Sequence, residues 1–172
     1  MKKKLIFIGG PMGVGKTAVC QHLKARLPKC VFLDGDWCWD ADPFLVTEQT
    51  KAMVLDNICH LLNNFLRCPA YETVLFCWVM HRQEIIEEIL NRLDTEGIQI
   101  SLFSLTAEKS ALKARLEKDI RAGLRDAGVI RRSLERLPLY GQLSTIIIDT
   151  TGKSVEEVSR EIYARLPDFS RA

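Results

Sequence analysis

The 172-residue chain predicts an α/β domain in which helices cover both faces of a parallel β-sheet. Short apolar runs alternate with helix-period segments from one end to the other, without a repeat, a low-complexity tract or a long linker. Residues 73–79 are almost continuously apolar, as a strand covered on both faces must be. The length suits a single domain, residues 1–172, that buries about 70% of its unfolded surface.

Five strands are expected, each bounded by polar residues, glycine or proline. They lie at residues 4–8, 31–33, 73–79, 98–105 and 145–148. Because helical segments separate them, the strands are expected to run parallel, with a ligand site at their carboxyl ends.

The first helix is expected from Lys16 to Leu27, where Pro28 stops it. The second is expected at 47–66, with Val54, Ile58, Leu61 and Phe65 on its buried face.

A third helix is expected at 83–95, ending at Gly97, a residue suited to a left-handed cap. A fourth begins near residue 107, is interrupted by the polar segment 119–128, and is followed by a helix at 129–137. The last helix opens with a capping box, Ser154 to Glu157. Its buried residues are expected to be Val155, Val158, Ile162 and Leu166.

The first strand is followed directly by Gly-Pro-Met-Gly-Val-Gly-Lys-Thr at residues 10–17, which fits G-x-x-x-x-G-K-[ST]. Glycines allow backbone N–H groups to turn inward around phosphate oxygens, and the following helix adds its free amides and the positive end of its dipole. Lys16 is expected to reach the β- and γ-phosphates, and the Thr17 hydroxyl to ligate Mg²⁺. The nucleotide-contacting residues expected from this segment are Gly10, Met12, Gly13, Val14, Gly15, Lys16, Thr17 and Ala18.

The same glycines also fit a second pattern. Residues 13–18 match the looser G-x-G-x-x-[GA] dinucleotide fingerprint, and Asp34 lies about 20 residues further on. A dinucleotide loop has no use for a Lys-Thr pair at the helix start, so the phosphate loop is favoured and ATP is the expected cofactor, with Mg²⁺.

The composition excludes several classes of partner and location for this protein. The net charge of +2 is too small to indicate nucleic acid or acidic membranes as partners, and no segment approaches the ~18 apolar residues of a membrane span. The six cysteines contain no C-x-x-C pair, which favours free thiols and a cytoplasmic location. The oligomeric state is left open.

Two carboxylates follow the second strand, Asp34 and Asp36. On an extended backbone they would share a face, although a turn at Gly35 would alter that. We assign Asp36 as the base that accepts a hydroxyl proton and Asp34 to the water shell of Mg²⁺, while the order of these roles stays open. The alternative is a polar turn with two solvated carboxylates.

The third strand ends without the acid that usually holds a metal in water-activating P-loop proteins. Its last residues read Phe-Cys-Trp-Val-Met at 76–80, and no Asn-Lys-x-Asp guanine-selecting segment follows any strand. A GTPase or a mechanical ATPase is therefore disfavoured, and a small kinase remains.

The segment after the fourth strand is rich in arginine. Arg121 and Arg125 lie in the glycine-containing stretch 119–128, which we interpret as a mobile lid that supplies positive charge to the migrating phosphoryl group and excludes water. Arg131 and Arg132 are weaker candidates, and an exposed basic helix face is the alternative.

The acceptor pocket is expected beside Asp36. Trp37, Trp39 and Arg82 are the candidate lining residues, because indole rings and one cation follow the second and third strands. Because aromatic residues are also common in protein cores, the sequence supports the acceptor pocket less strongly than the other parts of the site.

With these residues in place, the chain resembles the P-loop small-molecule and nucleotide kinases, which include shikimate, gluconate and adenylate kinases and chloramphenicol phosphotransferase. The resemblance rests on residues 10–17, the acids after the second strand, the Leu-Lys-Ala-Arg at 112–115, the lid arginines, and Asp-Thr-Thr-Gly at 149–152. It implies a three-layer P-loop NTPase fold with sheet order 2-3-1-4-5 and a helical lid. It also implies that Arg115 stacks on adenine and that Thr151 and Gly152 border the base.

The expected function is transfer of the γ-phosphate of ATP to a hydroxyl of a small molecule. Two alternatives remain: a nucleoside monophosphate kinase, in which Arg82 meets the acceptor phosphate, and a binding module that responds to ATP without catalysis. The double-tryptophan loop does not match the acceptor segments of the resembling kinases, so no acceptor is carried over from them.

Overall fold

A computed structural model describes residues 2–167. Five strands form one parallel sheet in the order β2-β3-β1-β4-β5, which confirms the predicted order. The strands are β1 (Lys4–Gly9), β2 (Cys30–Asp34), β3 (Thr73–Trp78), β4 (Gln99–Thr106) and β5 (Ile146–Asp149). The helices are α1 (Lys16–Lys24), α2 (Glu48–Arg67), α3 (Gln83–Asn91), α4 (Lys109–Arg121), α5 (Val129–Arg136) and α6 (Val155–Arg165), with two short 3₁₀ turns, η1 (Gly35–Cys38) and η2 (Leu137–Gln142).

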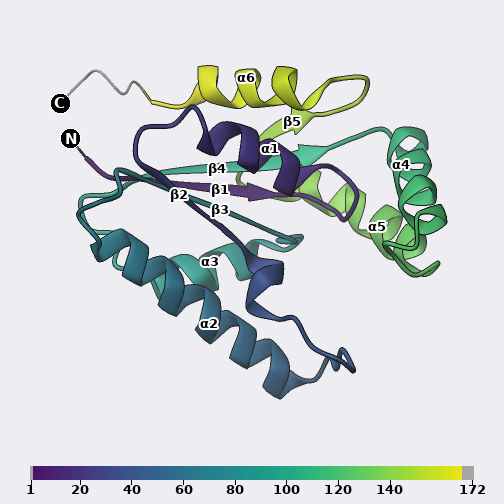
Figure 1. The fold of residues 1–172 in the computed structure, drawn as a ribbon, viewed down its shortest axis with the longest axis horizontal. Coiled ribbons are helices and arrows are strands. Elements are labelled where there is room, and N and C mark those ends of the chain that lie inside the picture. Colours follow the sequence, from purple (N-terminus) through teal and green to yellow (C-terminus); the bar gives the residue numbers. More distant parts are fainter. Residues whose placement is uncertain (1, 168–172) are drawn as a thin grey trace.

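The sheet separates two helical layers (Figure 1). Helices α1 and α6 lie on one face, and α2 and α3 lie on the other. Successive residues of β1 face opposite layers, so that Ile6 and Ile8 join the core beneath α1 and α6 whereas Leu5 and Phe7 join the core beneath α2 and α3. Both faces of β1 are therefore buried, which explains why residues 5–8 are continuously apolar.

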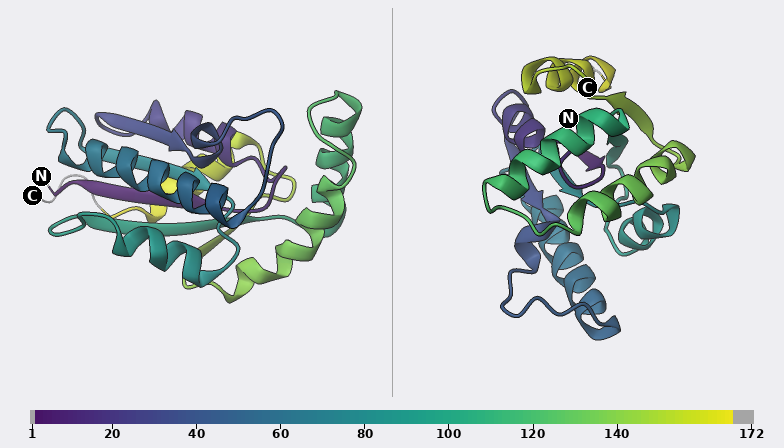
Figure 2. Two further views of the ribbon diagram at one scale, coloured as in Figure 1. Left: turned by 90° about the horizontal axis from the view of Figure 1, so that it is seen from below. Right: turned by 90° about the vertical axis from the view of Figure 1, so that its right-hand side faces the viewer.

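Helices α4 and α5 extend beyond the carboxyl ends of the strands (Figure 1). Viewed from the side, they form an arm at one end of the sheet (Figure 2). Buried Leu112 and Leu116 tie the arm to the core beneath α1, and Val129 does the same from α5. The arm is thus anchored at its base and stands over the end of the sheet where the sequence places its candidate residues.

Several element boundaries differ from the sequence expectations. Helix α4 continues to Arg121, so the interruption is a shorter turn, and α3 ends at Asn91. Gly97 does adopt a left-handed φ of 70°, but in the turn before β4 rather than as the cap of α3.

The buried faces of two helices also differ from the expectation. In α2 the fully buried positions include Leu62 and Leu66, whereas Leu61 and Phe65 are only partly buried, because the helix presents the adjacent stripe to the sheet. Val155 is 40% exposed, since it occupies the first turn of α6, where the chain leaves the core; the predicted capping box of that helix is confirmed.

The cysteines are free, as predicted, in all six positions. Cys20 on α1 and Cys77 on β3 are buried together behind the phosphate loop, and burial raises the pKa of the Cys20 thiol, as does its hydrogen bond with Cys77. These thiols pack the core. No helix among residues 2–167 has both the length and the apolar content of a membrane span.

Candidate active site

The phosphate loop between β1 and α1 needs glycine for conformation and for space. Gly13 has a φ of 80°, a region that L-residues rarely adopt. A Cβ added there would lie 2.5 Å from Cδ2 of Leu116 on α4, far inside van der Waals contact. Gly13 therefore lets the loop turn sharply while the arm packs directly against it.

The start of α1 carries a buried cation. Lys16 is 9% exposed, and its Nζ donates to the Pro11 carbonyl at 3.0 Å across the loop. Burial lowers the pKa of Lys16, whereas the charges of Asp36 and Asp34 act in the opposite direction. The helix N-terminus has no side-chain cap, which leaves its first amides available to an anion beside this ammonium group.

The hydroxyl of Thr17 is hydrogen-bonded directly to the acid that ends β2. Thr17 Oγ1 donates to Asp34 Oδ2 at 2.6 Å, and Asp34 is 4% exposed. The other oxygen of Asp34 accepts from the Asp36 backbone N–H at 3.1 Å, which fixes the start of η1. Asp34 pairs in register with Cys77 of β3. At this level of the sheet the acid therefore lies on β2, and β3 has none.

Asp36 faces the phosphate loop from the first turn after β2. Asp36 is exposed along the wall of the site, yet desolvation by the groups around it raises its pKa, and the Asp34 charge raises this pKa further. The positive charges of Lys16 and Arg125 act in the opposite direction and lower the pKa of Asp36. A carboxylate with a raised pKa, placed beside the hydroxyl group that loses its proton during transfer, has the properties of a general base.

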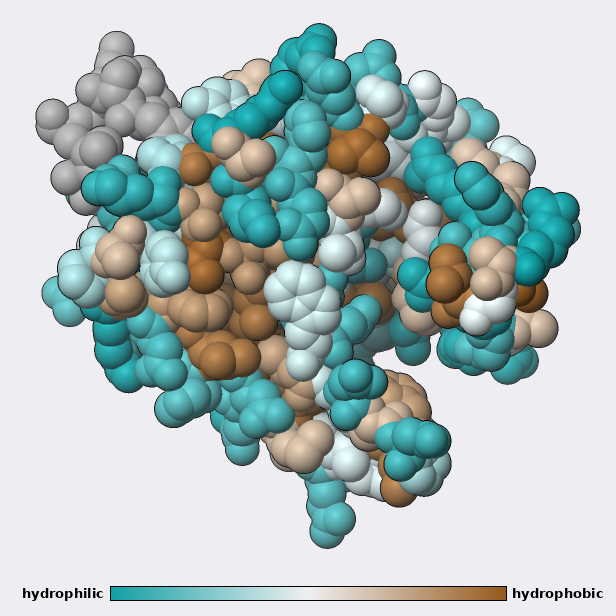
Figure 3. Space-filling model, viewed as in Figure 1, coloured by the Kyte–Doolittle hydropathy of each residue, from teal (hydrophilic) through white to brown (hydrophobic). Residues whose placement is uncertain are grey.

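These groups open into one cavity of about 400 Å³, within the usual size of a ligand site. Figure 3 shows the molecule hollowed between the arm and the rest of the domain. The lining residues are Met12, Gly13, Gly15, Lys16, Thr17, Ala18, Asp36, Arg115, Lys118, Asp119 and Arg125. The sequence-predicted loop, the predicted base and one lid arginine therefore meet in a single space.

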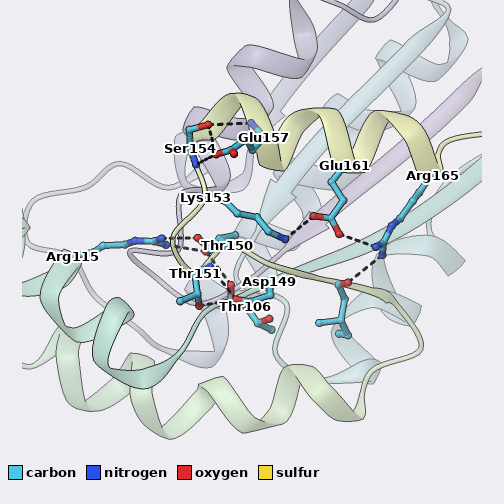
Figure 4. Close-up of polar contacts among 11 residues, drawn as sticks. Thr106, Arg115, Asp149, Thr150, Thr151, Lys153, Ser154, Glu157, Glu161 and Arg165 are labelled. Carbon is cyan, nitrogen blue, oxygen red and sulfur yellow. Dashed lines mark hydrogen bonds and ion pairs between the residues drawn. The ribbon is translucent and has the colours of Figure 1, made fainter.

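Arg115 connects three segments (Figure 4). From α4 it donates to the Val14 carbonyl at 3.5 Å, to the Thr150 hydroxyl at 2.9 Å and to the Thr150 carbonyl at 2.8 Å. It thus joins the phosphate loop, the arm and the turn after β5.

Thr151 and Gly152 are held beside Arg115 without lining the cavity. Thr151 Oγ1 accepts from the Glu108 N–H at 2.8 Å. The backbone N–H of Thr151 at 2.9 Å and its hydroxyl at 2.7 Å both donate to Asp149, and these two bonds lower the pKa of Asp149. Gly10 and Val14 are part of the phosphate loop but do not line the cavity either.

The two lid arginines have different surroundings. Both are exposed, but Arg125 lines the cavity and pairs with Asp119 at 3.0 Å, whereas Arg121 does not line the cavity. Arg132 is engaged with Asp126 at 2.7 Å.

Sequence reasoning missed Lys118 and Asp119, which also line the cavity. A signal for them was available: they lie three and four residues after Arg115, and such positions share one face of a helix.

The aromatic residues of η1 and of the loop that follows it lie outside this cavity. Trp37 is 55% exposed with its ring edge-on to Phe32 at 5.1 Å, and Trp39 packs on Phe44 at 4.5 Å. Arg82 is exposed at the N-cap of α3. The structure therefore brings only Asp36 of the candidate acceptor residues to the phosphate loop.

Within residues 2–167, no three His, Cys, Asp or Glu side chains are grouped to enclose a metal ion. Thr17 and Asp34 nevertheless suit Mg²⁺, a hard cation that commonly takes one or two protein oxygens together with water and substrate phosphates. The buried lysine and uncapped amides suit the phosphates of ATP in the same way.

Comparison with known proteins identifies the family and the fold of this chain. Residues 6–131 match the AAA_18 model, described as an AAA domain. The chain is 26% identical over 184 residues to a shikimate kinase of Vibrio cholerae serotype O1, covering 97% of both proteins.

Among solved structures, it superposes on a gluconokinase from Sinorhizobium meliloti 1021 with a TM-score of 0.69 and 18% identity, covering 95% of this chain and 91% of that one. It also superposes on a Deinococcus radiodurans tunicamycin resistance protein with a TM-score of 0.69 and 22% identity, covering 95% of each chain. At these identities the two superpositions establish the fold.

Proposed function

We propose that this chain, which belongs to the AAA_18 family of AAA domains, is a small-molecule kinase that transfers the γ-phosphate of ATP to a hydroxyl acceptor. The shikimate kinase and gluconokinase relatives support the kinase class. The observation that carries the transfer proposal is that Asp36 lines the same cavity as Lys16 and Thr17.

The phosphate loop performs the binding step. The first amides of α1 and the Lys16 ammonium group neutralise the terminal phosphates, and Gly13 keeps the loop closely packed on α4. Thr17 and Asp34 would hold Mg²⁺, with the hydroxyl as a direct ligand and the carboxylate in its water shell. When bound, the metal ion supplies positive charge to the β- and γ-phosphates.

Asp36 acts on the acceptor. Its carboxylate orients the attacking hydroxyl and receives its proton as the new O–P bond forms and the bond between the γ-phosphorus and the β,γ-bridging oxygen breaks, which releases ADP. Arg125 and Lys118, reaching in from the arm, stabilise the charge on the moving phosphoryl group. Movement of the 119–128 lid toward the loop would exclude water, which otherwise competes as acceptor.

Arg115 and the turn after β5 form the nucleotide end of the site. The guanidinium group is held by Thr150 at one edge of the cavity, a position from which its plane can stack on the adenine ring. Thr151 and Gly152 would border the base behind it.

The substitution Asp36→Asn tests the proposed base. It keeps the size of the side chain but removes the proton acceptor, so the rate of transfer should fall by about 10²–10⁴. The measurement is acceptor-dependent ADP release in a panel of polyols, hydroxy acids, sugars, nucleosides and nucleoside monophosphates. Full activity of Asp36→Asn with an identified acceptor would refute the base assignment.

The same panel separates the alternatives. A response confined to nucleoside monophosphates would identify a nucleotide kinase, for which Arg82→Ala should raise the KM of the acceptor. Release of ADP that no acceptor stimulates, with binding of ATP intact, would instead support a binding module.

A further inference from the structure

The turn that ends α4 folds the chain back toward the helix. Gly123 has a φ of 72°, and its N–H donates to the Ile120 carbonyl at 2.9 Å. The next N–H, that of Leu124, donates to the Asp119 carbonyl at 3.0 Å. These two bonds form a Schellman cap, in which glycine provides the left-handed residue. Because the cap ties the chain to the last turn of α4, Arg125 returns beside Asp119.

Arg125 and Asp119 form an ion pair inside the candidate active site. Arg125 Nε donates to Asp119 Oδ2 at 3.0 Å, and the two side chains are 35% and 32% exposed. Both residues line the cavity together with the phosphate loop. The pair therefore lies where the phosphates of ATP are expected to bind, rather than on the outer surface of the arm.

The Asp119 carboxylate places a negative charge in a cavity that is otherwise suited to phosphates. Four cationic side chains line this cavity: Lys16, Arg115, Lys118 and Arg125. Among residues 2–167, Arg125 is the one of these four that forms an ion pair, whereas Lys16 and Arg115 donate to neutral oxygens. The other lining acid, Asp36, has a proposed role as the base. Asp119 has no such role, so its function must be sought in its bond to Arg125.

A second acid of the same segment makes a similar pair away from the cavity. Asp126 accepts from Arg132 at 2.7 Å, and these residues are six apart in sequence, as Asp119 and Arg125 are. Neither Asp126 nor Arg132 lines the cavity. The two pairs therefore have the same chemistry and differ in whether a bound phosphate can reach them.

We propose that Asp119 is a positioning residue that holds Arg125 at the cavity before ATP binds and then gives it up to a phosphate group. A guanidinium group binds carboxylate and phosphate oxygens through the same planar set of donors, so a phosphate can take the place of the carboxylate. Until then the Asp119 charge offsets the repulsion among the lining cations. This inference rests on the proposed function, since it takes the cavity as the ATP site, but it does not require Asp36 to be the base.

The exchange of partners predicts the sign of an affinity change. If ATP binding breaks the pair, Asp119→Asn removes both a competing partner of Arg125 and a negative charge beside the phosphates. The variant should therefore bind ATP more tightly, by about 3- to 10-fold, of which up to about fivefold comes from the lost ion pair. If Asp119 instead stays bound and orients Arg125 toward the phosphate, Asp119→Asn should bind ATP more weakly.

A double-mutant cycle separates the exchange from simple repulsion. Isothermal titration calorimetry with ATP and Mg²⁺, without an acceptor, gives the affinities of the wild type, Asp119→Asn, Arg125→Ala and the double variant. Removal of the Asp119 charge reduces repulsion in every background, but it frees a partner only where Arg125 is present. Asp119→Asn should therefore tighten ATP binding by about 2- to 5-fold more with Arg125 present than with Arg125→Ala. The matched control Asp126→Asn should stay within about twofold of the wild type.

A measurement on the wild-type protein follows the exchange directly. The Nε–H signal of Arg125 in ¹H–¹⁵N spectra is assigned by its absence in Arg125→Ala. Because this group donates to Asp119, its signal should shift in Asp119→Asn before ATP is added, and it should shift in the wild type when ATP and Mg²⁺ are added. This readout does not depend on transfer to any acceptor.

The possible outcomes separate the exchange from the kinase proposal. Equal tightening by Asp119→Asn in both backgrounds, weaker binding of ATP by this variant, or an Arg125 signal that ATP leaves unchanged would overturn the exchange, whether or not the protein is a kinase. A protein that shows the expected coupling but phosphorylates no acceptor would retain the exchange and lose the proposed transfer. A wild type that binds no ATP would overturn both.

Discussion

The nucleotide end and the acceptor side of this site are built in different ways. Lys16 and Asp34 are almost fully buried and bonded to neighbouring groups, whereas Trp37 and the loop at 40–47 lie largely in solvent. Phosphates are common to all ATP-dependent kinases, so their binding groups can be fixed by the core of the fold. The acceptor varies, and side chains that contact it lie where substitution costs the domain little.

The first test of this contrast compares the two lid arginines. Arg125→Ala should lower kcat by about 10²-fold, because it removes a cation from the cavity. This value is the lower end of the range that the loss of one electrostatic donor usually causes. Arg121→Ala, four residues away on the exposed side, should stay within about twofold. The measurement is kcat at saturating ATP and acceptor, and equal losses for the two variants would remove the distinction.

A second test concerns the link between the phosphate loop and the turn after β5. Arg115→Lys keeps the charge but cannot bond the hydroxyl and the carbonyl of Thr150 together, so the free energy of unfolding should fall by about 1.5 kcal/mol. Urea denaturation measures it. Arg160→Lys is the matched control, because that arginine pairs with Glu156 on the surface and should change stability by less than about 0.5 kcal/mol. A control that destabilises as much as Arg115→Lys would contradict the linking role.

The smallest expected effect is on the acceptor side. Trp37→Ala should lower the free energy of unfolding by only about 0.5–1 kcal/mol, the value of its edge-on contact with Phe32. If Trp37 contributes to acceptor binding, the KM for the acceptor rises while the affinity for ATP is unchanged. Urea denaturation and steady-state kinetics on one preparation measure both, and a large loss of stability would show that the loop belongs to the core.

The sequence predicts the nucleotide end well because its chemistry lies in contiguous residues. The spacing of Gly13, Lys16 and Thr17 fixes the loop, and the alternation of apolar runs fixes the parallel sheet around it. Asp34 and Asp36 were identified because they directly follow a strand, and the structure joins Asp34 to Thr17.

The parts of the site that the sequence does not predict depend on contacts between distant segments of the chain. Trp78 reads as one more apolar residue of a buried strand, and only the pairing of β2 with β3 reveals that it packs against Gly35. The polar segment 119–128 predicts a break in the helix that begins near residue 107, but α4 continues to Arg121 and so brings Asp119 into the cavity beside Arg115 and Lys118. A polar helix face is difficult to distinguish from a loop when its neighbours are unknown.

Isothermal titration calorimetry with ATP and Mg²⁺ tests the central claim most directly, using the wild-type protein beside Lys16→Met and the exposed control Lys24→Met. The wild type and Lys24→Met should release heat of binding with one site per chain, and Lys16→Met should bind ATP far more weakly while remaining folded by circular dichroism. If the folded wild type shows no binding of any purine triphosphate, or if Lys16→Met binds as tightly as the wild type, the phosphate-loop site proposed here is wrong.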